Sequence, residues 1–367
     1  MTIATAAHAA GTLGAGVPNF TVRDGYSVTV AAKDLGETRF IEPGAPGILY
    51  VSQPNAKTIS TLKKQTDGTY QKIGEFTTDK GSVHGMHYKD GWLWFTQAGA
   101  VWKGRDQDGD GKADEEINIL SGLPEGGHWW RSILVTDDGF FTSIGDSGNI
   151  TDQTDTDRQK IWFYSLDGKE RKLWSSGIRN TEKLRMRPGT TELYGADHGS
   201  DWYGKPLGET KDAQPITNRV PDDEFNHYVE GGFYGHPFIV SNGLPRLEFK
   251  DRPDIIELAA KTILPAWSVG PHWATNGWTF ATTDKVGAKG DAFIACHGSW
   301  NSSVKQGYRI ERVMFDPQTG QPMGAMPMVS TLDGQNVLAR PVDCTEESDG
   351  SILFTVDGGM IYRLRKS

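Results

Sequence analysis

The sequence predicts an all-β chain folded as a six-bladed β-propeller, and three observations support this prediction. A repeat of similar length occurs six times in 367 residues, its strands alternate apolar with polar positions, and turn-forming and aromatic residues are abundant. The chain contains 45 Gly, 18 Pro, 12 Trp, 11 Tyr and 15 Phe. Propeller blades are four-stranded antiparallel sheets of about 40–50 residues, so six repeats predict six blades.

Each repeat consists of a turn, an alternating apolar or aromatic strand, a short polar break and a second strand. The repeats begin at Gly47, Gly91, Gly139, Thr191, Gly290 and Gly350. Before them, the segment FTVRDGYSVTVAA from Phe20 predicts a strand that closes the last blade and removes a free sheet edge. The alternative is an ordinary β-sandwich whose hairpins resemble one another by chance.

The interval between Thr191 and Gly290 is longer than the others. It contains a loop-rich run over residues 205–226, the motif GGFYGHP at 231–237 and another stretch with few strand signals. Long loops are uncommon unless they are functional, so we expect insertions over one face of the ring. Residues 1–18 are expected to form a flexible lead, and residues 19–367 a single catalytic propeller domain.

Charge and motif content exclude several classes of function. Thirty-eight basic and 47 acidic residues give a net charge of −9, which disfavours a nucleic-acid partner. No apolar stretch is long enough to cross a membrane, and no nucleotide-binding loop or haem motif occurs. The N-terminus lacks the charged and leucine-rich regions of a signal peptide and is expected to be a mature one. Cys296 and Cys344 either form one disulfide or remain two buried thiols.

A run of alternating carboxylates predicts a structural calcium site. Asp106, Asp108, Asp110 and Asp114 surround Gly111, which permits a tight turn around a hard cation. The run resembles the first half of an EF-hand, but Ile117 stands where that motif has its bidentate Glu. The alternative is an acidic, solvated turn with no bound ion.

A second group of polar residues lies in GGHWWRSILVTDDGFFTSIGDSGN. It consists of His128, Arg131, Asp146 and Asn149. His128 precedes one predicted strand and Asp146 ends the next, so the two side chains are expected to meet at one rim. A His–Asp pair there would serve as a general base with its orienting carboxylate. The alternative is a structural histidine beside Trp129 and Trp130.

Other cations and amides stand in breaks between strands. Arg179 and Asn180 in SGIRN suit an anionic ligand or a developing oxyanion, although an arginine in a turn is often only a surface charge. Arg340 and Lys305 offer further cations that hold carboxylates, and His272 in GPHWATNG is a candidate wall residue.

The motifs GGHWWR, SIGDSGN, SGIRN, DHGSD, PDDEFN, GGFYGHP, HGSWN with GYRIERV, and ARPVD occur in this order. From about Gly47 to the C-terminus, the chain resembles the sorbosone dehydrogenase family, relatives of soluble quinoprotein glucose and aldose sugar dehydrogenases. The resemblance implies a propeller that binds pyrroloquinoline quinone (PQQ) and calcium on one face. It also implies that PQQ carries the redox chemistry and the protein supplies binding and electrostatics.

The resemblance also implies roles for individual residues. His128 would take the substrate hydroxyl proton while hydride passes to the quinone, and Asp146 would orient His128. The backbone carbonyls of Gly199 and Ser200 would hold the cofactor calcium. The residues around PQQ would be His128, Arg131, Arg179, Asn180, Lys305 and Arg340. Trp129, Trp130, Trp202 and Trp300 would stack on a sugar or on the quinone, or else pack between blades.

Three departures from the family pattern concern the substrate rather than the cofactor. Ser302 follows HGSWN, where the family has a basic residue, and the loop ITDQTDTDR lacks the family's paired cysteines. His236 replaces the usual Trp in GGFYGHP.

The sequence therefore predicts a PQQ- and calcium-dependent dehydrogenase that oxidises an aldose, sugar aldehyde or related alcohol. An external acceptor such as a cytochrome would take the electrons, and the resemblance implies a periplasmic or secreted location. Two alternatives stay open, namely a calcium-dependent sugar lactonase and a non-catalytic binding propeller. A lactonase would need Glu, Asn and Asp side chains on its metal.

Overall fold

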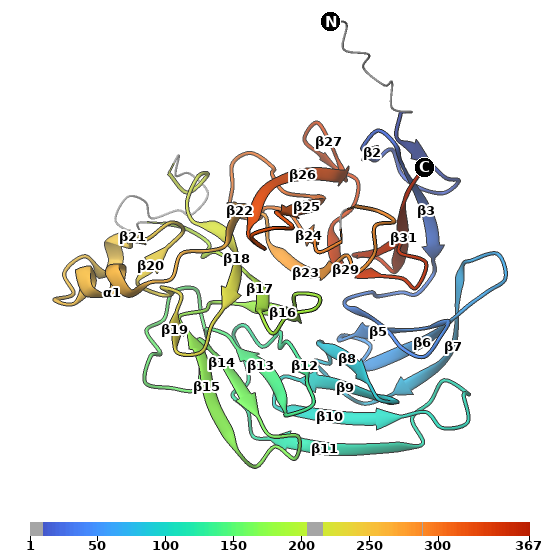
Figure 1. The fold of residues 1–367 in the computed structure, drawn as a ribbon, viewed down its shortest axis with the longest axis horizontal. Helices are drawn as coiled ribbons and strands as arrows, with labels where there is room; N and C mark the ends of the chain where they lie inside the picture. The colour runs from blue at the N-terminus through green and yellow to red at the C-terminus, as the bar shows by residue number, and fades with distance from the viewer. Residues whose placement is uncertain (1–9, 204–215, 288) are drawn as a thin grey trace, which may run out of the picture.

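The computed structural model of the protein describes residues 10–203, 216–287 and 289–367. These residues form six sheets arranged as blades around a central axis (Figure 1). The first three blades are β4 to β7 (Ile41–Pro43, Ile48–Gln53, Thr58–Lys64, Tyr70–Thr77), β8 to β11 (Met86–Lys89, Trp92–Gln97, Ala100–Arg105, Glu115–Ser121) and β12 to β15 (Leu134–Val135, Phe140–Ile144, Lys160–Tyr164, Arg171–Ser176).

The other three blades complete the ring. The fourth contains β16, β17, β18 and β22 (Thr181–Met186, Leu193–Asp197, Asp222–Tyr228, Trp267–Pro271), and the fifth contains β23 to β26 (Thr275–Phe280, Ala292–Cys296, Arg309–Phe315, Pro322–Ser330). The sixth joins β29, β30 and β31 (Pro341–Glu346, Ile352–Val356, Met360–Lys366) to the N-terminal β3 (Tyr26–Ala32). The six-bladed propeller is therefore confirmed, and β3 is the closing strand that the sequence predicted.

Some details differ from the expected pattern. Three blades carry a fifth strand: β19 (Gly232–Phe233) and β1 (Thr12–Leu13) pair in parallel with β15 and β3, and β2 (Thr21–Val22) pairs with β26. Because β1 is ordered, residue 18 does not mark the start of regular structure. The predicted loop over 205–226 is wrong for its end, since Asp222–Tyr228 is strand β18, and residues 204–215 lie outside the description.

The insertion after β18 extends outward from the ring beyond β18 and β19 (Figure 1). It contains β20 (Ile239–Val240), β21 (Leu244–Pro245), a 3-10 turn (Leu247–Phe249) and the helix α1 (Ile255–Lys261). A small hairpin of β27 (Leu332–Asp333) and β28 (Asn336–Val337) lies between the fifth and sixth blades. Within the described ranges, no helix has the length and apolar character needed to span a membrane.

Aromatic packing joins neighbouring blades, and a buried ion pair joins the fourth blade to the sixth across the fifth. Phe225 of β18 packs against Trp278 of β23 with ring centroids 4.8 Å apart. Lys183 of β16 donates to Asp343 of β29 over 2.7 Å, and both are buried. Gly277 of the intervening β23 makes this contact possible, because a Cβ there would lie 1.9 Å from the Asp343 carboxylate.

Candidate functional site

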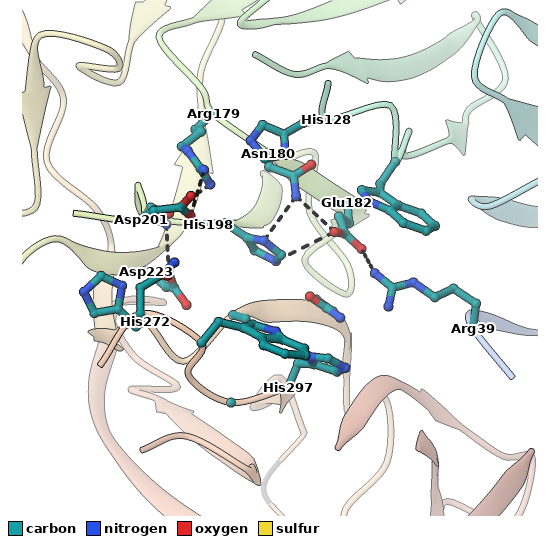
Figure 2. Close-up of a pocket in the computed structure, with 17 residues that line it drawn as sticks. Arg39, His128, Arg179, Asn180, Glu182, His198, Asp201, Asp223, His272 and His297 are labelled. Carbon is teal, nitrogen blue, oxygen red and sulfur yellow. Dashed lines mark hydrogen bonds and ion pairs between the residues drawn. The ribbon is translucent and has the colours of Figure 1, made fainter. Parts of the chain in front are cut away.

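The candidate site is a pocket of about 260 Å³ on the propeller, shown in Figure 2. Its walls come from loops that lead into or out of several blades, so residues far apart in the sequence meet here. The charged and polar side chains among them are those of Arg39, His128, Arg179, Asn180, Glu182, His198, Asp201, Asp223, His272, Asn276, His297 and Asn301. The predicted residues His128, Arg179, Asn180, Gly199 and His272 thus come together.

Arg179 fixes the loops on one side of the pocket. Its Nε and Nη2 donate to the backbone oxygen and to Oδ1 of Asn149, both over 2.9 Å, and its Nη1 donates to the Gly199 carbonyl over 2.9 Å. Asp201 approaches the same guanidinium at 3.4 Å. The guanidinium is nearly buried, so its charge acts on the pocket with little screening by water.

Asn180 connects the pocket floor to a buried ion pair. Its Nδ2 donates to Glu182 over 3.0 Å and lies 3.1 Å from Nδ1 of His198, whereas its Oδ1 is buried without a partner among the described residues. Glu182 also accepts from Arg39 over 3.0 Å. Burial acts to raise the pKa of Glu182, but the Arg39 charge and His84 outweigh it and hold that pKa well below its usual range.

His128 presents a neutral imidazole to the pocket. Its Nε2 is buried and has no hydrogen-bond partner in the part of the chain that the structure covers. Burial, followed by the charge of Arg179, lowers the pKa of His128 to about 3. The ring is therefore a proton acceptor, not a cation, at neutral pH.

The expected side-chain pair of His128 and Asp146 is not formed. Only the backbone N–H of His128 contacts Asp146, at its carbonyl over 2.8 Å. The Asp146 carboxylate instead lies 2.7 Å from Nε2 of His236 and accepts from the backbone N–H groups of Gly148 and Thr151. Gly148 and Thr151 lie in the turn after the strand, and His236 lies on the distant insertion. Together they hold the Asp146 carboxylate, so that it pairs with His236 rather than with the His128 ring.

Three other predicted cofactor residues do not line the pocket. Arg131 is 1% exposed, and its guanidinium donates to the carbonyls of Ala98, Pro124 and Ser143. These hydrogen bonds connect neighbouring loops and keep the guanidinium away from the pocket. Lys305 is exposed on the surface loop. Arg340 lies behind the lining residue Trp300, with its guanidinium carbon 4.0 Å from the ring centroid.

The aromatic predictions divide in the same way. Trp130 and Trp300 line the pocket, whereas Trp129 and Trp202 do not. Trp129 stacks on Trp130 with ring centroids 3.7 Å apart, and Arg39 lies 4.4 Å over the Trp130 ring.

A small cavity of about 20 Å³ adjoins the pocket and shares Gly199 with it. The predicted calcium-binding residue Ser200 lines this cavity, together with Asp197, Asp222 and Glu224. Burial raises the pKa of Asp197 to about 6 and that of Glu224 to about 8. Carboxylate and carbonyl oxygens are the donors that calcium prefers, but in the described part of the chain these carboxylates do not form a close group of the kind found at Asp106, Asp108 and Asp114.

Several members of the pocket have no sequence signal of their own. His198 and Asp223 were recognised only within the motifs DHGSD and PDDEFN, and His297 only within HGSWN. The Nε2 of His297 donates to Asp357 over 2.8 Å, so a carboxylate orients this lining histidine. Arg39 lies outside every motif named above, because it stands in the short segment before strand β4, whose sequence has no distinctive pattern.

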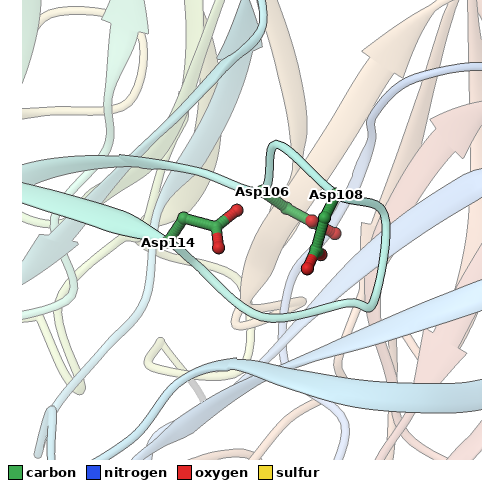
Figure 3. Close-up of side chains that lie close together, drawn as sticks. All are labelled: Asp106, Asp108 and Asp114. Carbon is green, nitrogen blue, oxygen red and sulfur yellow. The ribbon is translucent and has the colours of Figure 1, made fainter.

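The acidic loop lies away from this pocket, between β10 and β11 (Figure 3). Asp106, Asp108 and Asp114 bring carboxylate oxygens within 4.8 Å of one another, while Asp110 stays outside the group. Asp106 accepts from the backbone N–H groups of Gly109 and Gly111. The prediction that four carboxylates form one group therefore fails for Asp110. Calcium binding by Asp106, Asp108 and Asp114 stays a prediction. Both cysteines are buried and unbridged.

Comparisons with known sequences give two partial matches. Residues 259–350 match the TrAA12-like family. A protein of Borreliella burgdorferi described as uncharacterized is 28% identical over 217 residues, which is 56% of this chain. The chain spans about half the length of that relative, 51%.

Solved structures match over almost the whole chain. The holo PQQ domain of pyranose dehydrogenase from Coprinopsis cinerea has a TM-score of 0.80 at 16% identity and covers 96% of this chain and 100% of its own. The calcium structure of a Trichoderma reesei family AA12 enzyme has a TM-score of 0.82 at 18% identity, with 97% and 100% covered. The PQQ-bound aldose sugar dehydrogenase from Streptomyces coelicolor has a TM-score of 0.62 at 17% identity, with 93% and 98% covered. At these identities the likeness establishes the six-bladed propeller fold of this chain.

Proposed function

We propose that this chain is a PQQ- and calcium-dependent oxidoreductase that oxidises an aldose, a sugar aldehyde or a related alcohol. The observation that carries the proposal is a set of buried polar atoms without partners, His128 Nε2 and Asn180 Oδ1, beside the Arg179 guanidinium. Buried polar atoms are normally hydrogen-bonded, so these two acceptors favour a polar ligand that offers donors, such as a substrate hydroxyl. The Arg179 charge beside them favours an anionic group on the same ligand or on a cofactor. The sorbosone dehydrogenase motifs and the resemblance to PQQ-bound propellers support the same ligand.

The side chains of the pocket fit a planar quinone with three carboxyl groups. Arg179 and Arg39 lie on opposite sides of the pocket in Figure 2, and each brings a positive charge that attracts a carboxylate. Asn180 supplies an amide between them. Arg340 stacks on the indole of Trp300, a lining residue that is 71% exposed and can contact a flat ligand.

The charge of the pocket explains why calcium would be required. Glu182 and Asp201 balance the charges of Arg39 and Arg179, and burial raises the pKa of the third carboxyl, Asp223, to about 7. The pocket therefore has no excess of positive charge for a ligand with three carboxylates unless a divalent cation is bound near it. Calcium on the carbonyl oxygens of Gly199 and Ser200 would supply that charge.

When bound, PQQ supplies the two-electron acceptor that no amino-acid side chain provides. Neutral His128 takes the proton of the substrate hydroxyl, which general-base catalysis requires. Arg179 stabilises the negative charge that develops beside it, whereas Asn180 offers its partnerless Oδ1 as an acceptor to a ligand hydroxyl. We propose an external acceptor such as a cytochrome for the electrons, and a periplasmic or secreted location.

One observation favours a second candidate, a calcium-dependent sugar lactonase. The small cavity beside Gly199 is lined by Asp197, Asp222 and Glu224, and oxygen donors of this kind would hold a catalytic cation that activates water. This candidate needs calcium but no PQQ, so the two functions are separable by experiment.

The test is a titration of the calcium-loaded protein with PQQ, followed by absorbance and calorimetry. Assays with a panel of aldoses and a dye acceptor follow, and lactone hydrolysis is measured with calcium alone. We expect stoichiometric PQQ binding and dye reduction. Binding without turnover would overturn the substrate class, and hydrolysis without PQQ binding would establish the lactonase. If the protein neither binds PQQ nor hydrolyses lactones, both enzymatic functions are overturned and a non-catalytic binding propeller is supported.

A further inference from the structure

A second cavity, of about 330 Å³, lies on the outer side of the third blade. It is enclosed by the loop over residues 154–160, by the end of β15 and by the insertion that carries α1. It shares no lining residue with the central pocket. Its volume lies within the range of small-molecule sites in proteins.

The lining of this cavity carries an excess of positive charge in a chain whose net charge is −9. Arg158, Lys160, Arg252 and Lys261 line it with one carboxylate, Asp254. Arg252 is already paired, because it donates to both oxygens of Asp254 over 2.9 and 3.0 Å. Across the described ranges, the other three cations have no carboxylate within ion-pair distance.

Arg158 and Lys160 are buried, at 8% exposure each, and their donors reach only neutral oxygens. Arg158 Nη1 donates to the carbonyls of Gly126 and Gly145 over 3.2 Å, and its Nη2 donates to that of Glu125. Lys160 Nζ donates to the carbonyls of Thr154, over 2.7 Å, and Thr156, which leaves one of its three N–H groups for a ligand. Burial lowers the pKa of both side chains, which is the expected effect of a desolvated charge. Such a charge costs free energy that a bound anion offsets.

The rest of the lining combines the polar side chains of Thr154, Gln159 and Ser176 with apolar and aromatic ones. Phe233, Phe238 and Leu258 line it, and the Lys261 ammonium lies 5.3 Å from the Phe233 ring centroid. Lys261 is exposed at the end of α1, and its ammonium has no hydrogen-bond or ion-pair partner in the residues that the structure covers. It is the donor most available to a ligand that enters the cavity from solvent.

We propose that this cavity binds a small organic carboxylate, with its charged group at Lys261 and Lys160 and its apolar body against Phe233 and Phe238. The basis is the combination of an enclosed volume, three cations without carboxylate partners and two aromatic rings. Inorganic phosphate would satisfy the charges but not the apolar surface, and a neutral aromatic molecule would satisfy only the apolar surface. The site does not depend on the proposed function of the central pocket.

The test is isothermal titration calorimetry of the full-length protein with benzoate, with benzyl alcohol as the neutral analogue and with inorganic phosphate. We expect saturable benzoate binding at one site that is at least tenfold tighter than that of either control ligand. Lys261→Met should weaken benzoate binding at least tenfold. Lys169→Met is the matched control, since Lys169 is 81% exposed and does not line the cavity, and it should leave the affinity within twofold.

Two further measurements keep the proposal falsifiable. Lys160→Met removes a buried donor, so its melting temperature is measured first and its affinity is compared only if it folds. Raising the salt concentration should weaken benzoate binding, because the attraction is partly electrostatic. The proposal is overturned if benzoate does not bind, if benzyl alcohol binds as tightly, or if Lys261→Met leaves the affinity unchanged.

Discussion

His128 combines burial, a neutral imidazole and a ring nitrogen without a partner, and these properties suit a group that accepts a proton. His198 differs, because its two nitrogens contact Asn180 and the Thr275 carbonyl at 3.1 and 3.0 Å. A histidine with both nitrogens engaged holds loops in place, whereas one with a free nitrogen is available for chemistry. His297 is the competing candidate, since Asp357 orients it from the other side of the pocket.

The two histidines are distinguished by comparing His128→Ala with Asp357→Asn in the reconstituted enzyme. If His128 is the general base, its loss should lower kcat by about 10²–10⁴-fold and leave PQQ affinity within about threefold. Asp357→Asn should then keep kcat within about threefold. Dye reduction measures kcat, and the PQQ titration measures affinity. Near-normal turnover in His128→Ala with a large loss in Asp357→Asn would assign the base to His297.

The sequence was informative about which loops form the site but not about which side-chain atoms meet. His128, Arg179, Asn180 and Gly199 meet in one pocket because strand ends of a propeller converge at the ring, whereas their roles stay predictions. The partner of Asp146 was missed because His236 lies 90 residues away in an insertion whose path has no periodic signal. Arg131 was misassigned because an arginine that binds ligands and one that binds carbonyls have the same local sequence.

At the scale of strands, the alternation of apolar and polar residues predicted most strands correctly. It failed for strands that contain several charged residues. The six repeat starts lie at or close to the second strand of each blade, where buried apolar residues dominate. Strand β18 was read as a loop because DDEFNHY contains few apolar residues, although Asp223 is buried and accepts from the backbone N–H of Gly199 over 2.7 Å. Carboxylates that point into a site disrupt the pattern from which strands are predicted.

Strand β25 contains a buried carboxylate outside the site that gives a pH dependence of stability. Burial raises the pKa of Glu311 to about 7, and Arg309 at 3.6 Å only partly opposes this. Since the folded pKa exceeds the unfolded one, the stabilisation is fully present below about pH 4.5 and is lost as pH rises through 7. Glu311→Gln stays neutral throughout. Its free energy of unfolding relative to wild type should therefore increase by about 3 kcal/mol between pH 4.5 and 8.

Urea unfolding at a series of pH values measures this difference. Glu230→Gln is the control for the loss of one negative charge, because the Glu230 side chain is 55% exposed and forms a surface ion pair with Lys172. Its difference from wild type should stay constant across the same range. A constant difference for Glu311→Gln as well would show that burial of Glu311 does not favour its neutral form.

At the scale of the whole molecule, the ring is closed by hydrogen bonds between the two ends of the chain. Strand β3 pairs antiparallel with β31, and Val28 of β3 is fully buried in the core of the last blade. This closure was predictable because a propeller whose last blade lacks a strand would expose a free edge. The outward insertion with α1 was not predictable, because nothing in a loop sequence says on which side of a ring it folds.

The closure predicts that a disulfide between the two terminal strands will stabilise the molecule. Ser27 and Arg365 are directly opposite each other in the β3–β31 register, so Ser27→Cys with Arg365→Cys should form a bridge on oxidation. The bridge would close nearly the whole chain into one loop. We expect the oxidised protein to unfold at higher urea than its reduced form, by about 2–4 kcal/mol. In Ser27→Cys with Lys366→Cys, the second cysteine points to the opposite face of β31 and should not bridge. Bridging in that control, or no gain in stability when the first pair is oxidised, would show that the ring is not closed in this register.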